Sequence, residues 1–153
     1  GLALTDVDPT SWRSVISWVP QSPTLVPGTI LDNMGDLPQR DLDEAARATG
    51  FDAVLATTPD GWNSTIGSGG VGLSVGQRQR LALTRALAAR SQVVVLDEPT
   101  AHLDAVSEET VVRAIHAMRE EGRTVIVIAH RNAIIEVADT IIDVAHADEE
   151  ALA

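Results

Sequence analysis

Short apolar runs alternate along the chain with longer segments in which apolar positions recur at helical spacing. Four runs rich in Val and Ile are bounded by polar residues and predict buried strands. They cover residues 15–19, 93–96, 125–128 and 141–144. Strands that alternate with helices favour an α/β fold with a mainly parallel sheet.

Helical spacing is clearest between the second and third of these strands. Val111, Ile115 and Met118 fall on one face of a helix expected over residues 105–121, and Gly122 provides a stop. A helix placed between two strands in this way predicts a βαβ unit.

Two further helices are expected earlier in the chain. One covers residues 75–89, with Ser74 as its N-cap. Its apolar stripe consists of Ala82, Leu83, Ala86 and Leu87. A smaller helix over 41–49 ends at Gly50, and the Gly-, Ser-, Thr- and Pro-rich segment 57–72 is expected to be a long loop.

Charge and composition narrow the classes of partner. The chain has 22 acidic and 11 basic residues, a net charge of -11, which would repel a nucleic-acid backbone. There is no cysteine, so disulfides and thiolate metal sites are excluded. Prolines interrupt the uncharged stretch 14–31, so no membrane-spanning helix is expected, and the acidic tail 146–153 is expected to fray.

Two carboxylates follow the strand at 93–96, at the end of a strand where α/β sheets place ligand-binding groups. Asp97 would hold Mg²⁺, which prefers oxygen ligands, and Glu98 would act as general base on a water molecule. The plainer alternative is that the pair only ends the strand and caps the next turn.

Two more candidate groups stand at element ends. His130 follows the strand at 125–128 and could orient a phosphate or a water molecule, whereas His116 and His146 are interpreted as surface or packed residues. Ser74 and Gly76 open a helix, and the free amides of a helix start bind phosphate. An ordinary capped helix is the alternative.

Taken in order, these segments resemble the nucleotide-binding domains of ABC transporters. The matching motifs are Val19-Pro20-Gln21 for the Q-loop, Leu73-Ser74-Val75-Gly76-Gln77 for the LSGGQ signature, residues 93–98 for Walker B, Ala101-His102-Leu103-Asp104 for the D-loop, and Ala129-His130-Arg131 for the switch histidine. The signature differs from the family pattern only at Val75. Five motifs in the family order make the resemblance specific.

The resemblance implies a partial P-loop NTPase-type sheet flanked by helices, with a helical signature subdomain over about 30–90 and a Walker B to switch-histidine core over 91–145. It also implies ATP and Mg²⁺ as cofactors, with Gln21 and Asp97 at the metal and Gln21, Glu98 and His130 at the reacting water.

The same resemblance implies partners and a location. Ser74, Val75, Gly76, Gln77 and Asp104 would contact ATP held by a second ABC ATPase domain, in a homodimer or heterodimer. A transmembrane domain is the other partner, at the cytoplasmic face of the plasma membrane, and the chain itself is expected to be soluble.

The sequences of two loops are most similar to those of exporters whose membrane and ATPase domains share one polypeptide. The relevant segments are 22–30 and 66–70, with Ser68 near the place of the usual glutamate of the second loop. Trp18 and the sequence of residues 101–104 resemble the corresponding positions in subunits of the heterodimeric thiol exporter associated with cytochrome bd assembly.

The family's Walker A loop requires a lysine, and all 11 basic residues here are arginine. The Walker A loop of relatives lies N-terminal to the Q-loop, so Gly1 is expected to follow it. We therefore expect this chain alone to neither bind ATP tightly nor hydrolyse it. Without the strand that leads into Walker A, the sheet should have unpaired edges, giving dimerisation, strand exchange or local rearrangement.

Two other functions remain open from the sequence. An ABC-type ATPase of DNA repair or translation shares the signature and Walker B motifs, but the net charge and exporter-like loops argue against it. A catalytically silent partner module is disfavoured because both Glu98 and His130 are present.

Overall fold

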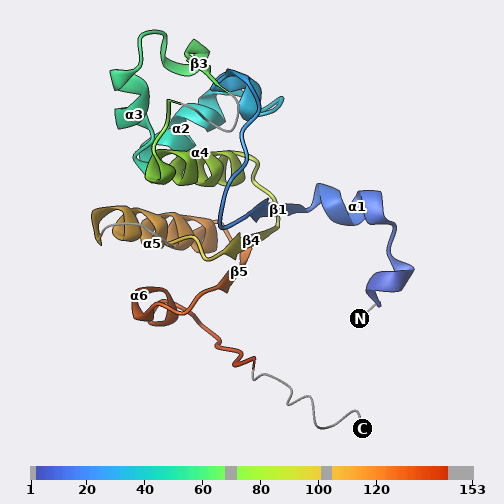
Figure 1. Cartoon of the computed structure of the whole chain (residues 1–153). Coiled ribbons are helices and arrows are strands. Elements are labelled where there is room, and N and C mark those ends of the chain that lie inside the picture. The colour runs from blue at the N-terminus through green and yellow to red at the C-terminus, as the bar shows by residue number, and fades with distance from the viewer. Residues whose placement is uncertain (1–2, 68–71, 101–104, 145–153) are drawn as a thin grey trace, which may run out of the picture.

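A computed structural model describes residues 3–67, 72–100 and 105–144 (Figure 1). Its main sheet has three parallel strands in the order β1-β4-β5, namely Ile16–Val19, Val93–Asp97 and Thr124–Ile128. The predicted α/β class with a mainly parallel sheet is confirmed. Among the described residues, β1 and β5 each pair only with β4, so both have an unpaired outer edge.

Side chains alternate between the two faces of this sheet. One face is covered, since Val19, Val94 and Leu96 are each 0% exposed. On the opposite face, Trp18 and Ile126 are aligned in the register through Val95, and they are 61% and 49% exposed. The sheet therefore has one buried face and one partly exposed face, although apolar residues occur on both.

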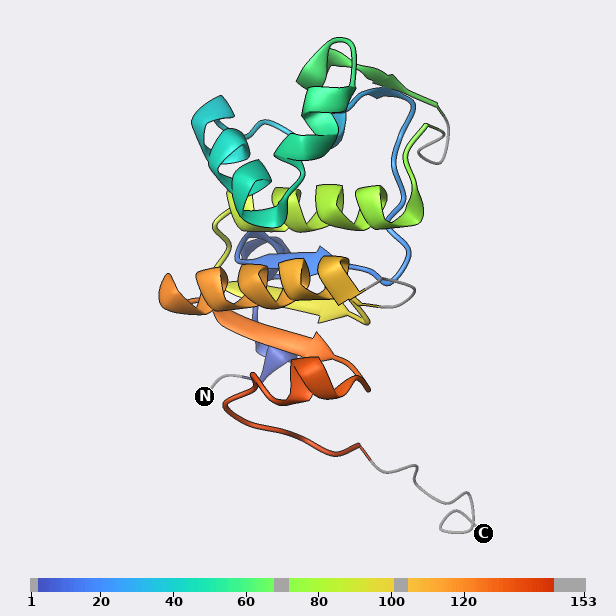
Figure 2. The ribbon, with the colours of Figure 1, turned by 90° about the vertical axis from the view of Figure 1, so that its left-hand side faces the viewer.

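Helices α5, Ala105–Glu120, and α4, Val75–Ala88, both contact the main sheet, α5 at β5 and α4 at β1, and helix α2, Gln39–Thr49, packs against both of them (Figure 2). The predicted stripe of α5 is buried at Val111, Ile115 and Met118. The stripe predicted for α4 is also buried. The remaining described helices are η1 (Leu4–Asp6), α1 (Pro9–Ser14), η2 (Leu31–Asn33), α3 (Asp52–Thr57), η3 (Gly61–Asn63) and α6 (Asn132–Ile135).

Local chemistry sets where the helices begin and end. Ser74 caps α4 as predicted, and its hydroxyl accepts from the Gln77 N–H while the Gln77 side chain accepts from the Ser74 N–H. Helix α2 ends at Gly50, which adopts φ 66°, a left-handed conformation that glycine enters without steric cost.

The predicted long loop over 57–72 is wrong in part. It includes η3 and a short strand, β3 (Thr65–Ile66), which pairs antiparallel with β2 (Gly28–Thr29). Sequence patterning missed this pairing because strands of two residues are too short to show alternation. Helices α2 and α3 lie near this small sheet (Figure 1). The proposed boundaries of a helical subdomain stay a prediction.

The strand predicted at 141–144 is also wrong, because the segment forms no ladder with any described strand. Ile141, Ile142 and Val144 are 66%, 81% and 85% exposed. An apolar run becomes a strand only where a neighbouring strand satisfies its backbone groups, and the outer edge of β5 stays unpaired. The tail expected to fray, from 146, lies outside the described residues.

No helix of the described residues has both the length and the apolar character needed to cross a bilayer. The stretch 14–31 contains β1 and β2.

Candidate functional site

The carboxyl ends of β1, β4 and β5 lie at one edge of the sheet because the strands are parallel. Gln21 follows β1, Glu98 follows β4 and His130 follows β5. Gln21 Nε2 donates a hydrogen bond of 2.8 Å to Glu98 Oε2, and His130 Nδ1 lies 3.4 Å from Glu98 Oε1. The structure thus brings together three predicted residues that are distant in sequence, with one carboxylate between two polar side chains.

The backbone at Glu98 has an uncommon conformation. Its φ is 43°, in the left-handed region that non-glycine residues rarely occupy. Its N–H donates to the Ile128 carbonyl at 2.9 Å, so the end of β4 is tied to the end of β5. This conformation turns the chain directly after Asp97, and such strain is frequent at functional positions.

The site is accessible to solvent. The side chain of His130 is 71% exposed and that of Glu98 is 31% exposed. The pair therefore contributes little to the stability of the fold, and both side chains can be reached from solvent.

Asp97 precedes Glu98 and lies opposite Ile128 in the register, with its side chain half-buried. Carboxylate and amide oxygens suit Mg²⁺, which commonly takes one or two protein ligands and completes its shell with water and phosphate. The described residues contain no cluster of three or more His, Cys, Asp or Glu side chains able to hold a metal by themselves. Asp97 and Gln21 each carry an oxygen of the type that such a metal takes, and their joint role as metal ligands stays a prediction.

The predicted signature residues form a second group at the start of α4. Val75 is 52% exposed, and Gly76 lies in the first turn of the helix. Among the described residues, no hydrogen bond or ion pair joins Ser74 or Gln77 to the group around Glu98. Asp104, with the rest of 101–104, lies outside the described residues.

Two supporting residues escaped the sequence interpretation. Arg131 Nη1 pairs with Glu108 Oε2 at 2.9 Å, which ties the residue after His130 to α5. Asn33 is buried, and its side-chain amide bonds to Val26 and Thr29, bracing the segment after Gln21. The sequence carries no clear signal for Asn33, because polar Asp32 precedes it and its burial is decided by the tertiary structure.

Comparison with known proteins agrees with these motifs. The sequence profile of the ABC transporter family matches residues 1–101. The chain belongs to the ABC transporter family. It is 40% identical over 147 residues to the ABC multidrug transporter MDR5 of Trichophyton rubrum, and 38% identical over 151 residues to the ABC-type transporter atr1 of Mycosarcoma maydis.

The fold resembles that of a solved exporter. The structure of a bacterial Atm1-family ABC exporter with ATP bound matches with a TM-score of 0.80 and 31% identity, covering 89% of this chain and 24% of that one. These matches relate the chain to the ATPase domains of ABC exporters. The two fungal matches cover 92% and 93% of this chain but only 11% of each relative, so the chain spans about a tenth of their length.

Proposed function

We propose that this chain is part of the ATP-hydrolysing domain of an ABC exporter, where hydrolysis energises transport. The observation that carries the proposal is the position of Glu98 between Gln21 and His130 at the carboxyl edge of the parallel sheet. In this proposal Glu98 is the general base for the attacking water, and His130 orients that water or the terminal phosphate.

Gln21 has two roles in the proposal. Its amide nitrogen bonds to Glu98 here, which leaves its amide oxygen without that bond. In the proposal this oxygen and the Asp97 carboxylate are both ligands of the metal. Mg²⁺ bound with ATP would neutralise charge on the phosphates. Movement of Gln21 from Glu98 toward the metal would free the carboxylate to accept a proton from water.

The signature residues Ser74, Val75, Gly76 and Gln77 are proposed to contact ATP held by a second ABC ATPase domain, together with Asp104. A helix start offers free amides and the positive end of the helix dipole to phosphate oxygens. A transmembrane domain at the cytoplasmic face of the plasma membrane is the other proposed partner.

The 153-residue chain alone is proposed to be inactive, because it contains no lysine for a Walker A loop. Titration calorimetry of this chain with Mg-ATP is expected to show no saturable heat at micromolar concentrations. Micromolar affinity would contradict this part of the proposal.

The catalytic role is tested in a longer protein that includes a Walker A loop. Glu98→Gln is expected to lower the ATPase rate by at least about 100-fold, because the general base is lost. Glu109→Gln is the matched control, since it makes the same chemical change on an exposed side chain of α5. An unchanged rate in Glu98→Gln would favour a catalytically silent module.

A more specific proposal is that the exporter is a heterodimeric thiol exporter, and it rests on Trp18 and on the sequence of residues 101–104. ATP-dependent accumulation of cysteine or glutathione in inverted vesicles carrying the longer protein is the expected result. Vesicles that hydrolyse ATP without accumulating either thiol would contradict the substrate while leaving the ATPase proposal intact.

A further inference from the structure

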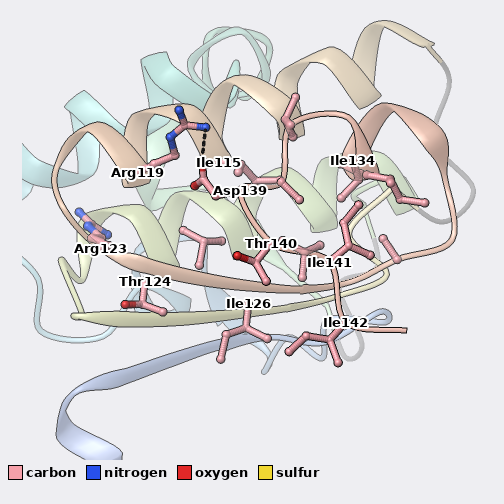
Figure 3. Close-up of a pocket in the computed structure, with 16 residues that line it drawn as sticks. Ile115, Arg119, Arg123, Thr124, Ile126, Ile134, Asp139, Thr140, Ile141 and Ile142 are labelled. Carbon is pink, nitrogen blue, oxygen red and sulfur yellow. Dashed lines mark ion pairs between the residues drawn. The ribbon is translucent and has the colours of Figure 1, made fainter. Parts of the chain in front are cut away.

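Strand β5 is firmly held from its beginning to its last residue. Arg123 precedes the strand (Figure 3), and its side chain is 5% exposed. The guanidinium of Arg123 donates to the carbonyls of Ala86 and Leu87 at the end of α4. All five residues of β5 pair with β4. The backbone is therefore fixed as far as Ile128, two residues before His130.

The chain beyond Ile128 has little regular structure of its own. Residues 129–131 lie in neither a helix nor a strand, and α6 after them has only four residues. A helix this short is marginal without tertiary contacts. The His130 imidazole is 71% exposed and lies 3.4 Å from Glu98, longer than a good hydrogen bond, so this contact does not lock the ring. The position of His130 therefore depends on what holds the backbone after it.

Arg131 holds that backbone from two directions. Its carbonyl begins α6 by accepting hydrogen bonds from two N–H groups of the helix, and its Nη1 donates to Glu108 Oε2 at 2.9 Å. Among the residues that the structure describes, the side chains of 129–138 form one other hydrogen bond or ion pair, that of His130 with Glu98. The bond to Glu108 is thus the polar contact that ties this segment to a neighbouring helix.

Glu108 is a suitable anchor because α5 is a long, well-packed helix. The helix has 16 residues, and its apolar face is buried in the core. Glu108 lies in its first turn, where the helix dipole favours a negative charge. The side chains of Glu108 and Arg131 are 18% and 35% exposed, so solvent screens their attraction less than that of a pair on the open surface.

We propose that Arg131 and Glu108 form a positioning pair, which fixes the backbone at His130 and so keeps the imidazole beside Glu98 during ATP hydrolysis. The inference rests on the proposed function, in which Glu98 and His130 act on the attacking water. The pair acts through His130 rather than on ATP itself. Misplacement of a reacting group by about 1 Å can lower a rate about 100-fold, so a contact that adds little stability can have a large kinetic effect.

Removal of either charge tests the pair in the longer protein that includes a Walker A loop. Arg131→Gln and Glu108→Gln should each lower kcat for ATP hydrolysis at least about tenfold, because His130 is no longer held. The KM for ATP should stay within about twofold of its original value, because the interaction acts in the reaction step rather than in binding. The two substitutions together should lower kcat no further than either one alone.

A double-mutant cycle separates positioning from a general structural effect. His130→Ala removes the group that the pair places, so adding Arg131→Gln to it should change kcat by less than about twofold. Single-turnover measurements at excess enzyme give access to such low rates. Arg131→Lys should keep most of the original rate, because one donor atom reaches Glu108 in the structure and an ammonium group can replace it.

Two control variants neutralise a carboxylate on or beside the same helix. Glu109→Gln changes the next residue of α5, whose side chain is exposed. Asp139→Asn breaks the ion pair of 3.4 Å that joins Arg119 of α5 to the segment after α6 (Figure 3). Both variants should retain the full kcat, and circular dichroism melting checks that every variant remains folded.

Four outcomes overturn the positioning pair. The first is an unchanged kcat in Arg131→Gln or Glu108→Gln, and if Glu98→Gln is impaired in the same protein, the proposed function stands without the pair. The second is an equal loss from Arg131→Gln with and without His130, because the effect then does not pass through the imidazole. The third is a loss of similar size in Asp139→Asn. The fourth is an unchanged rate in Glu98→Gln, which removes the pair and the proposed function together.

Discussion

The two faces of the main sheet have similar residues and different surroundings. Val94 and Leu96 are fully buried beneath the helices, whereas Trp18 and Ile126 on the other face are 61% and 49% exposed. Parallel sheets are normally covered on both faces, and their strands are correspondingly apolar throughout. The comparison shows that the apolar composition of a parallel strand does not predict which of its two faces is covered by helices of the same chain.

The largest expected effect comes from removing equivalent side chains on the two faces. Leu96→Ala should reduce the free energy of unfolding by about 2–5 kcal/mol, because it leaves a cavity in the core. Ile126→Ala should cost less than about 1 kcal/mol, because that side chain is already half in water. Urea unfolding followed by circular dichroism at low protein concentration measures both, and similar losses would show that the open face is covered in solution.

The helix cap on the covered side gives the next largest effect. Ser74→Ala removes the side-chain acceptor for the Gln77 N–H and should destabilise the chain by about 1 kcal/mol. Ser74→Asp is the control, because aspartate also caps helix starts. If both variants lose equal stability in urea unfolding, the capping box does not stabilise α4.

The strained position at the end of β4 permits a comparison of two variants. Glu98→Gly should be more stable than Glu98→Ala by about 1 kcal/mol, because glycine adopts positive φ without steric cost. Both variants lose the carboxylate, so the difference isolates the backbone. Thermal unfolding that ranks alanine equal to or above glycine would contradict a left-handed conformation at this position.

The smallest effect is expected in the loop after Gln21. The Thr29 N–H donates to Asp32 at 2.7 Å, and this hydrogen bond lowers the pKa of Asp32 below its usual 3.8. Its stabilising contribution is full above that usual value and is lost as pH falls through the lowered folded-state pKa. From pH 7 to pH 2 the chain should lose slightly more stability than its Asp32→Asn variant.

Asp36→Asn serves as the control for this last comparison, because it removes one exposed carboxylate nearby without removing the bond to Thr29. Urea midpoints at the two pH values provide the measurement. If the chain and its Asp32→Asn variant lose the same stability between pH 7 and pH 2, the hydrogen bond from Thr29 to Asp32 does not form in solution.

Much of the fold could be predicted from local patterns in the sequence. The strands around Val94 and Val125, the stripe of α5 and the cap at Ser74 all follow from residues close in sequence. Gln21, Glu98 and His130 could be grouped because each follows a strand of a parallel sheet. Their contacts could not be predicted, since residues 77 apart meet there only through strand pairing.

The errors have the same physical origin. Residues 141–144 have strand-like composition, but a strand also needs a partner edge, which no local pattern reports. Strand β3 was missed because its two residues become a strand only through β2. By itself, the sequence determined the helix periods, the caps, the strand cores and the order of the motifs, because these depend on neighbouring residues. Only the tertiary structure decided which sheet face is open, which edge is unpaired and how Glu98 is held, because these depend on segments far apart in the chain.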